Sequence, residues 1–289
     1  MIKKIKWALR EIYKTFLSLH TNSPYISGDS IAQIADLIVT EKNLNDLSLI
    51  NDIQSSKSIF VEGHNLIEFM NNYRALLRNK VVISGNSDTN FNTPVDGADD
   101  LKLLLCQNST IPNTAKLKTL PIGIENLRLG RSGFKRLHQP QKSFDIVDKI
   151  LVPPMSPTNE VRAEVLKAVT PHNDLFDVAP KLLPTKEYFE LVRRYKFVFV
   201  CEGNGYDTHR MWEVLYQNSF PVVLMSDWVT TLEWLEVPIL IVESISDVTK
   251  ELLEDFAREH SDFNSTQLPQ LWIPFWKNFL EVTTKNGSL

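Results

Sequence analysis

The residues with the richest chemistry lie between positions 201 and 213, where two glycines alternate with acidic, basic and hydroxyl side chains (CEGNGYDTHRMWE). This stretch follows an apolar segment, KFVFVC, and leads into a segment whose apolar residues have helical spacing. Gly203 and Gly205 allow tight turning and close approach of a ligand to the backbone. A helix beginning directly after them offers free N–H groups and the positive end of its dipole. The pattern predicts an anion-binding loop.

Two charged residues of this loop support that prediction. Arg210 lies in the first helical turn, where acidic residues are normally favoured, and a bound phosphate would explain its position. Glu202 ends a buried strand, so its carboxylate must be paired or face a cleft. A plain turn at the glycines and an ion pair from Arg210 to Asp207 or Glu213 are the structural alternatives.

The elements that must position this loop alternate between strands and helices. In the first half, the pattern predicts a short helix capped by Asp29 or Ser30 and a helix over Leu66–Arg78. Apolar runs between them predict strands, the third of which also fits a short helix: Ser58–Val61, Lys80–Ser84, Leu101–Cys106 and Leu117–Ile122. Strands interleaved with helices favour a parallel sheet.

A second alternating series follows residues 130–143, a glycine-, proline- and lysine-bearing segment that we interpret as the connection between two domains. Its predicted strands are Asp148–Pro153, Lys196–Cys201, Phe220–Met225 and Pro238–Val242. Its predicted helices are Thr158–Val169, Thr185–Tyr195, Asp207–Gln217 and Val248–Glu259. We therefore expect an α/β protein with two Rossmann-like, doubly wound domains, residues 1–140 and 141–289, facing each other across a cleft.

The composition narrows the functional classes. The 31 basic and 35 acidic residues give a formal net charge of −4, which argues against a nucleic-acid partner. The two cysteines exclude a disulfide framework and a thiolate zinc site, and the six histidines never pair at helical metal-ligand spacing, so we expect no metal site. No apolar run is long enough to span a bilayer, and we expect a cytoplasmic protein.

The first 20 residues combine apolar residues at helical spacing with lysines and an arginine at the other positions. This pattern predicts a basic amphipathic helix. Such a helix can pack against its own domain with a solvated basic face, or it can lie at a membrane surface. Peripheral membrane contact through residues 1–20 therefore stays open.

The segment 196–224 (KFVFVCEGNGYDTHRMWEVLYQNSFPVVL) resembles the nucleotide-sugar-binding segment of exostosin-like glycosyltransferases. That segment of the family has a recurring order of features: a strand, a glycine-bearing loop, an Asp-Thr-His-Arg helix start, a Trp-Glu pair and a Pro-Val-Val strand. It is similar, more distantly, to the donor segment of alpha-1,3-fucosyltransferases. The resemblance implies a GT-B architecture, with the sugar donor in the C-terminal domain, the acceptor toward the N-terminal one, a C-terminal helix that crosses back to the first domain, and no obligatory metal or other cofactor.

The resemblance also implies roles for individual residues. Arg210 would hold the donor diphosphate, with Arg162 as a second phosphate ligand, and Glu202 and Glu213 would contact ribose or sugar hydroxyls. The phosphate loop itself would be formed by Gly203, Asn204, Gly205, Asp207, Thr208 and His209. The acceptor implied by the family is a glycan or a lipid-linked oligosaccharide.

Transfer with inversion also needs a general base on the acceptor side of the cleft. Inversion is favoured because Glu202 and Glu213 lack the spacing of the paired glutamates in many retaining GT-B enzymes. Asp88, in the loop after the strand Lys80–Ser84, is the first candidate base, with Glu62 and His64 second; turn and cap roles are their alternatives.

Two other functions remain possible from the sequence. The chain could be a sugar- or nucleotide-binding module that has lost catalysis. It could also be an S-adenosylmethionine-dependent methyltransferase, because EGNG after a strand resembles the glycine loop of those enzymes; its place after a later strand argues against this.

Overall fold

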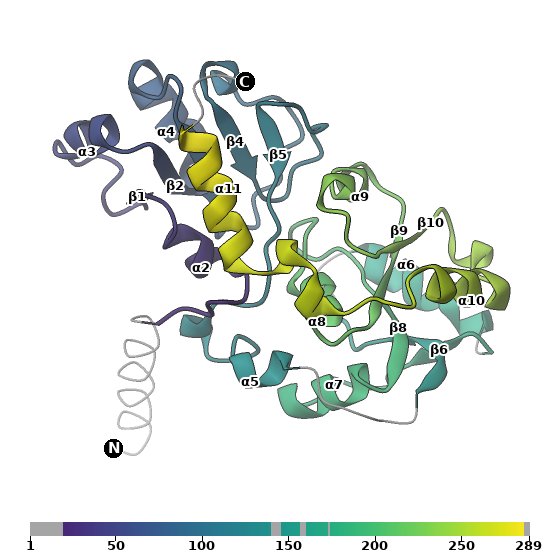
Figure 1. Cartoon of the computed structure of the whole chain (residues 1–289). Coiled ribbons are helices and arrows are strands. Elements are labelled where there is room, and N and C mark those ends of the chain that lie inside the picture. The colour runs from purple at the N-terminus through teal and green to yellow at the C-terminus, as the bar shows by residue number, and fades with distance from the viewer. Residues whose placement is uncertain (1–19, 140–145, 157–159, 173, 286–289) are drawn as a thin grey trace, which may run out of the picture.

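The computed structural model describes residues 20–139, 146–156, 160–172 and 174–285. Two parallel five-stranded sheets form the framework, one in each half of the chain (Figure 1). Their strands are short apolar runs because helices and loops bury both faces of a parallel sheet. This arrangement confirms the predicted α/β class with two Rossmann-like domains.

The first sheet keeps chain order across its strands, from β1 to β5. Its elements are β1 (Leu37–Val39), β2 (Ser58–Glu62), β3 (Val81–Gly85), β4 (Leu103–Cys106) and β5 (Leu117–Thr119), with helices α2 (Gly28–Ala32), α3 (Leu49–Ser55) and α4 (Leu66–Tyr73). Helix α5 (Lys135–His138) follows the sheet.

The second sheet has the order β10-β9-β8-β6-β7, so the chain reverses its direction of winding between β6 and β8. Its strands are β6 (Val147–Val152), β7 (Phe176–Val178), β8 (Tyr195–Phe199), β9 (Phe220–Leu224) and β10 (Leu240–Val242). Its helices are α6 (Glu160–Val169), α7 (Thr185–Val192), α8 (His209–Tyr216), α9 (Asp227–Thr230) and α10 (Lys250–Glu259). Ligands of doubly wound sheets bind at such a switch point, beyond the carboxyl ends of the strands.

The two domains share one hydrophobic cluster. It joins Ile83 and Leu105 of the first sheet to Trp212 and Trp228 of the second domain. The last helix, α11 (Ile273–Lys285), contacts α2 and β3 and buries Trp276 completely, and Figure 1 shows it lying against the first domain. The two halves are therefore packed together through apolar side chains.

The structure also corrects details of the predicted elements. Helix α2 is capped by Ser27, whose hydroxyl accepts from the Ser30 backbone N–H, and not by Asp29 or Ser30. The Asp29 carboxylate instead accepts hydrogen bonds from Arg128 and Asn86. Strand β5 stops at Thr119, short of the predicted Ile122, and the Ile122 backbone N–H donates to the Asp207 carboxylate instead of continuing the ladder.

Several expectations fall outside the described residues. These are the amphipathic helix over residues 1–20 apart from His20, the domain boundary at residue 140 with the end of the connecting segment, and the first two residues of the helix predicted over Thr158–Val169. Within the described residues, none of the helices is long and apolar enough to cross a membrane.

Candidate functional site

A cavity of about 670 Å³ lies between the two domains, at the switch point of the second sheet. We call it the inter-domain cavity. The first domain contributes Asp88, Ile122, Glu125, Leu129, Arg131 and Ser132, and the second contributes chiefly Pro154, Ser156, Arg162, Tyr188, Gly203, Asn204, Gly205, Asp207, Thr208, His209, Arg210 and Glu213. The loop after β8 therefore lines a cleft that both domains build.

The glycines of this loop serve close approach and not an unusual backbone conformation. Positive φ angles among the described glycines occur at other positions. A Cβ atom on Gly205 would lie 2.8 Å from the Asn108 side chain, and one on Gly203 would lie 3.0 Å from the Arg162 guanidinium. Each glycine thus lets a polar side chain lie directly on the loop.

Asp207 holds the loop against the first domain. Its carboxylate accepts one hydrogen bond from the Ile122 backbone N–H at 2.7 Å and another from Trp212 Nε1 at 2.8 Å. The Asp207 backbone N–H donates to Asn108 Oδ1 at 2.8 Å. Burial raises the pKa of Asp207 to about 7, and these hydrogen bonds oppose the shift. Asp207 is therefore a positioning residue whose side chain is fully used by the protein.

Two arginines face the cavity. Arg210 Nη2 donates to the Pro154 carbonyl at 2.8 Å, and the guanidinium lies 5.7 Å from the centre of the Tyr188 ring. Arg162 Nε donates to the Glu202 carbonyl at 2.7 Å, and its Nη1 donates to Ser156. Burial, with the nearby charge of Arg210, lowers the pKa of Arg162. Two cations held close together on neutral carbonyls favour a bound anion.

The first turn of α8 adds donors at the same place. The helix begins at His209, two residues later than predicted, because the backbone of Thr208 is extended. Its N-cap residue, Thr208, makes no side-chain cap bond, and the Thr208 hydroxyl is buried without a hydrogen-bond partner among the described residues. An anion at this N-terminus would meet that hydroxyl, the helix dipole and the guanidinium of Arg210 together.

His209 crosses to the first domain, where its Nδ1 lies 2.8 Å from the Gly123 carbonyl. Because a carbonyl oxygen can only accept, His209 carries a proton on Nδ1 and donates it to this hydrogen bond. Gly123 has a φ of 69°, and a Cβ there would lie 2.2 Å from the Ile26 carbonyl oxygen. Glycine is therefore required at the point where the first domain presents its carbonyl to His209.

Three acidic residues also line the cavity. Glu213 is buried, and desolvation raises its pKa while the charges of His209 and Arg210 oppose the shift. Glu125 is buried and paired with Arg131 at 2.6 Å. Asp88 comes from the first domain, and its carboxylate accepts a hydrogen bond from Asn204 at 3.2 Å. Of these three, Asp88 belongs to the first domain and makes an exposed hydrogen bond across the cleft, to Asn204 of the second domain.

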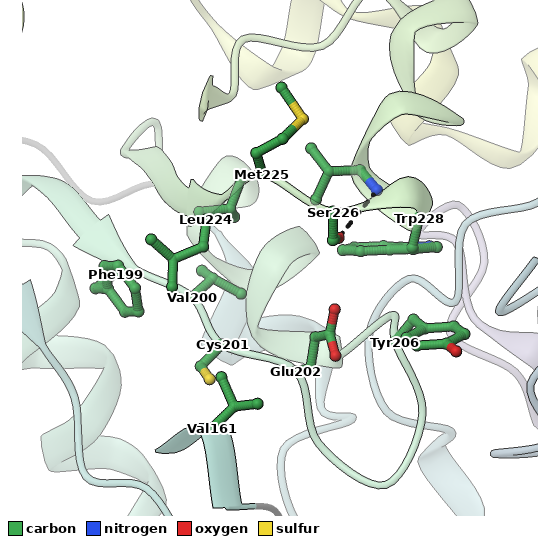
Figure 2. Close-up of a pocket in the computed structure, with 12 residues that line it drawn as sticks. Val161, Phe199, Val200, Cys201, Glu202, Tyr206, Leu224, Met225, Ser226 and Trp228 are labelled. Atoms are coloured by element: carbon green, nitrogen blue, oxygen red, sulfur yellow. Dashed lines mark hydrogen bonds between the residues drawn. The ribbon is translucent and has the colours of Figure 1, made fainter. Parts of the chain in front are cut away.

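The other sequence candidates lie elsewhere. Glu62 and His64 do not line the inter-domain cavity; His64 Nε2 lies 3.8 Å from Glu62 Oε2 at the end of strand β2. Glu202 lines a second, smaller pocket beside the loop, together with Tyr206, Ser226 and Trp228 (Figure 2). Within the described residues, no group of three or more histidine, cysteine and acidic side chains gathers that could hold a metal ion.

Among the cavity-lining residues that the sequence analysis did not predict, two contact its charged groups. Tyr188 lies on α7 and supports Arg210, and Arg131 comes from the segment read only as a domain connection. A basic residue in that segment was a signal for Arg131. Nothing in the local pattern of α7 distinguishes Tyr188 from an ordinary core residue.

Comparison with known protein families and with curated proteins gives no sequence match for this chain.

Proposed function

We propose that the chain is a glycosyltransferase of GT-B type, transferring a sugar from a nucleotide-sugar donor to a glycan or lipid-linked acceptor. One observation carries the proposal: the inter-domain cavity sets Arg162, Arg210 and the free end of α8 together at the switch point of a doubly wound sheet. A cationic pocket at that place suits a nucleoside diphosphate.

These residues fit the chemistry of glycosyl transfer. The bond between the anomeric carbon and the diphosphate oxygen breaks, and the electron pair leaves with the diphosphate. Arg210, Arg162 and the N–H groups of α8 would stabilise the growing negative charge without requiring a metal. Glu213, at the cavity wall, would accept a hydrogen bond from a hydroxyl of the donor.

The acceptor would enter from the side of the first domain. Its hydroxyl oxygen forms the new bond to the anomeric carbon, and its proton passes to a base. Asp88 is our candidate for this base because it lines the cavity on the first-domain side and its carboxylate is only partly occupied, by Asn204. Attack from that side, opposite the diphosphate, would invert the configuration at the sugar.

A thermal-shift series tests the donor site. The purified protein is heated with UDP, GDP, CDP, ADP, inorganic pyrophosphate or S-adenosylmethionine, each with and without EDTA. We expect at least one nucleoside diphosphate to raise the midpoint of unfolding, and the rise to survive EDTA, since the described ligands are protein groups. Stabilisation by S-adenosylmethionine alone, or by none of the six compounds, would contradict the proposal.

A further inference from the structure

The second pocket, which we call the Glu202 pocket, has a volume of about 240 Å³ and lies at the carboxyl ends of β8 and β9. Its walls are largely apolar or aromatic: Val161, Leu224, Met225, Tyr206 and Trp228. Figure 2 shows the Glu202 carboxylate pointing toward Ser226 and Trp228, with the Tyr206 ring beside it. A largely apolar pocket of this size, with one carboxylate at its side, suits a heteroaromatic ring with hydrogen-bond donors on its edge.

The Glu202 pocket adjoins the inter-domain cavity. Val161 lines the pocket, and the next residue, Arg162, lines the cavity. Likewise Glu202 lines the pocket, and Gly203, which follows it, lines the cavity. Arg162 Nε is bonded to the Glu202 backbone carbonyl at 2.7 Å, so the phosphate-side cation lies on the wall of the pocket. A nucleotide whose diphosphate lies between Arg162 and Arg210 would therefore have its base within reach of this pocket.

The polar groups of the pocket select among the bases. Burial raises the pKa of Glu202, and a hydrogen bond from the Ser226 side chain opposes the shift. An ionised carboxylate can only accept hydrogen bonds, through two oxygens. Guanine presents two neighbouring donors, its ring N1–H and its 2-amino group. Uracil has a single N–H between two carbonyls, and adenine and cytosine place a bare ring nitrogen beside their amino group.

We propose that the Glu202 pocket binds a guanine base, so that the sugar donor is a GDP-sugar. This inference rests on the proposed donor site and adds the identity of its nucleotide. Apolar walls argue for the base over the ribose in this pocket, because a ribose presents hydroxyl groups on most of its surface. Paired donors on a carboxylate typically distinguish the right base by about 5- to 150-fold in affinity.

Calorimetric titration of the wild-type chain with GDP, IDP, UDP, ADP and inorganic pyrophosphate tests the inference without any substitution. IDP is the matched probe, because its base differs from guanine only in lacking the 2-amino group. We expect GDP to bind at least ten times more tightly than UDP or ADP, and IDP to bind about ten times more weakly than GDP. Equal affinities for all four nucleotides would overturn the guanine assignment and leave the donor site standing.

Two variants test whether the preference for GDP comes from Glu202. Glu202→Gln should bring the affinities for GDP and IDP to within about threefold of each other while the affinity for pyrophosphate stays unchanged. Glu243→Gln, which removes an exposed carboxylate outside the pocket, should keep the wild-type preference. An equal loss for every nucleotide in Glu202→Gln would instead place Glu202 on the ribose and overturn the inference. No binding by any nucleotide or by pyrophosphate would overturn the proposed donor site itself.

Discussion

Replacing Asp207 with alanine is expected to lower the free energy of unfolding by about 2–5 kcal/mol. The variant leaves the buried Trp212 indole N–H and the half-buried Ile122 N–H without an acceptor, and an unpaired buried donor costs about 1–3 kcal/mol. Because Ile122 belongs to the first domain and Trp212 to the second, the loss weakens their contact. Urea unfolding followed by tryptophan fluorescence measures it.

The variant Asp207→Asn is the matched control, because its side chain keeps nearly the same volume and one oxygen that can accept a hydrogen bond. We expect it to cost less than Asp207→Ala. A cost below about 1 kcal/mol for Asp207→Ala would contradict the bridging role.

The stability cost of Asp207→Ala is also expected to change with pH. With the pKa of Asp207 raised to about 7, the native state holds a proton that the unfolded chain releases near pH 4. Asp207 therefore contributes stability that is lost as the pH rises from about 4 to about 7. We expect the cost of Asp207→Ala to be largest near pH 4–5 and to shrink toward pH 7. Burial lowers the pKa of His138 to about 4, which makes wild-type stability rise with pH over part of the same range. His138 is present in both wild type and Asp207→Ala, so its contribution cancels in the difference between their free energies of unfolding.

Replacing Arg210 with alanine is expected to weaken the binding of a nucleoside diphosphate by about 10- to 150-fold, because a hydrogen bond to a charged group contributes about 1.5–3 kcal/mol. The fold should persist, since the guanidinium donates to the Pro154 carbonyl, lies over Tyr188 and acts by charge on Glu213, all within the second domain. Titration calorimetry measures the change.

The control for this prediction is Arg194→Ala, which removes an exposed positive charge that does not line the cavity. Arg210→Lys should recover part of the affinity, because lysine keeps the charge but not the planar pair of donors. Wild-type affinity in Arg210→Ala would remove Arg210 from the phosphate site.

Much of the framework could be predicted from the sequence. The apolar runs KFVFVC and FPVVLM are long enough to mark β8 and β9, and the strand–glycine loop–helix pattern places residues 201–213 at the carboxyl edge of a sheet. The structure has this loop at the cavity between two domains. Strand β1 was not predicted because Ile38 continues the helical spacing of Ile31 and Ile34, and strand β7 was not predicted because Asp177 interrupts its apolar residues.

The composition of the cavity was harder to predict, since it depends on contacts between distant segments. Which first-domain loop faces the cleft is decided by the packing of the two sheets, so the pattern alone could not separate Asp88 from Glu62 and His64. The contact between His209 and the Gly123 carbonyl joins positions 86 residues apart, and no spacing rule indicates it. Asp207 was assigned to phosphate by its place in the loop, whereas its side chain bonds to the protein.

The central claim is that the inter-domain cavity binds a sugar nucleotide as the donor for transfer. The most direct measurement is the release of nucleoside diphosphate from UDP-, GDP-, CDP- and ADP-linked hexoses, followed by mass spectrometry with wild type and Arg210→Ala in EDTA. Slow hydrolysis reports donor cleavage even where the acceptor is unknown. We predict release from one class of donor, lost in Arg210→Ala. Equal release from wild type and the variant, or intact donors throughout with no binding, would contradict the account.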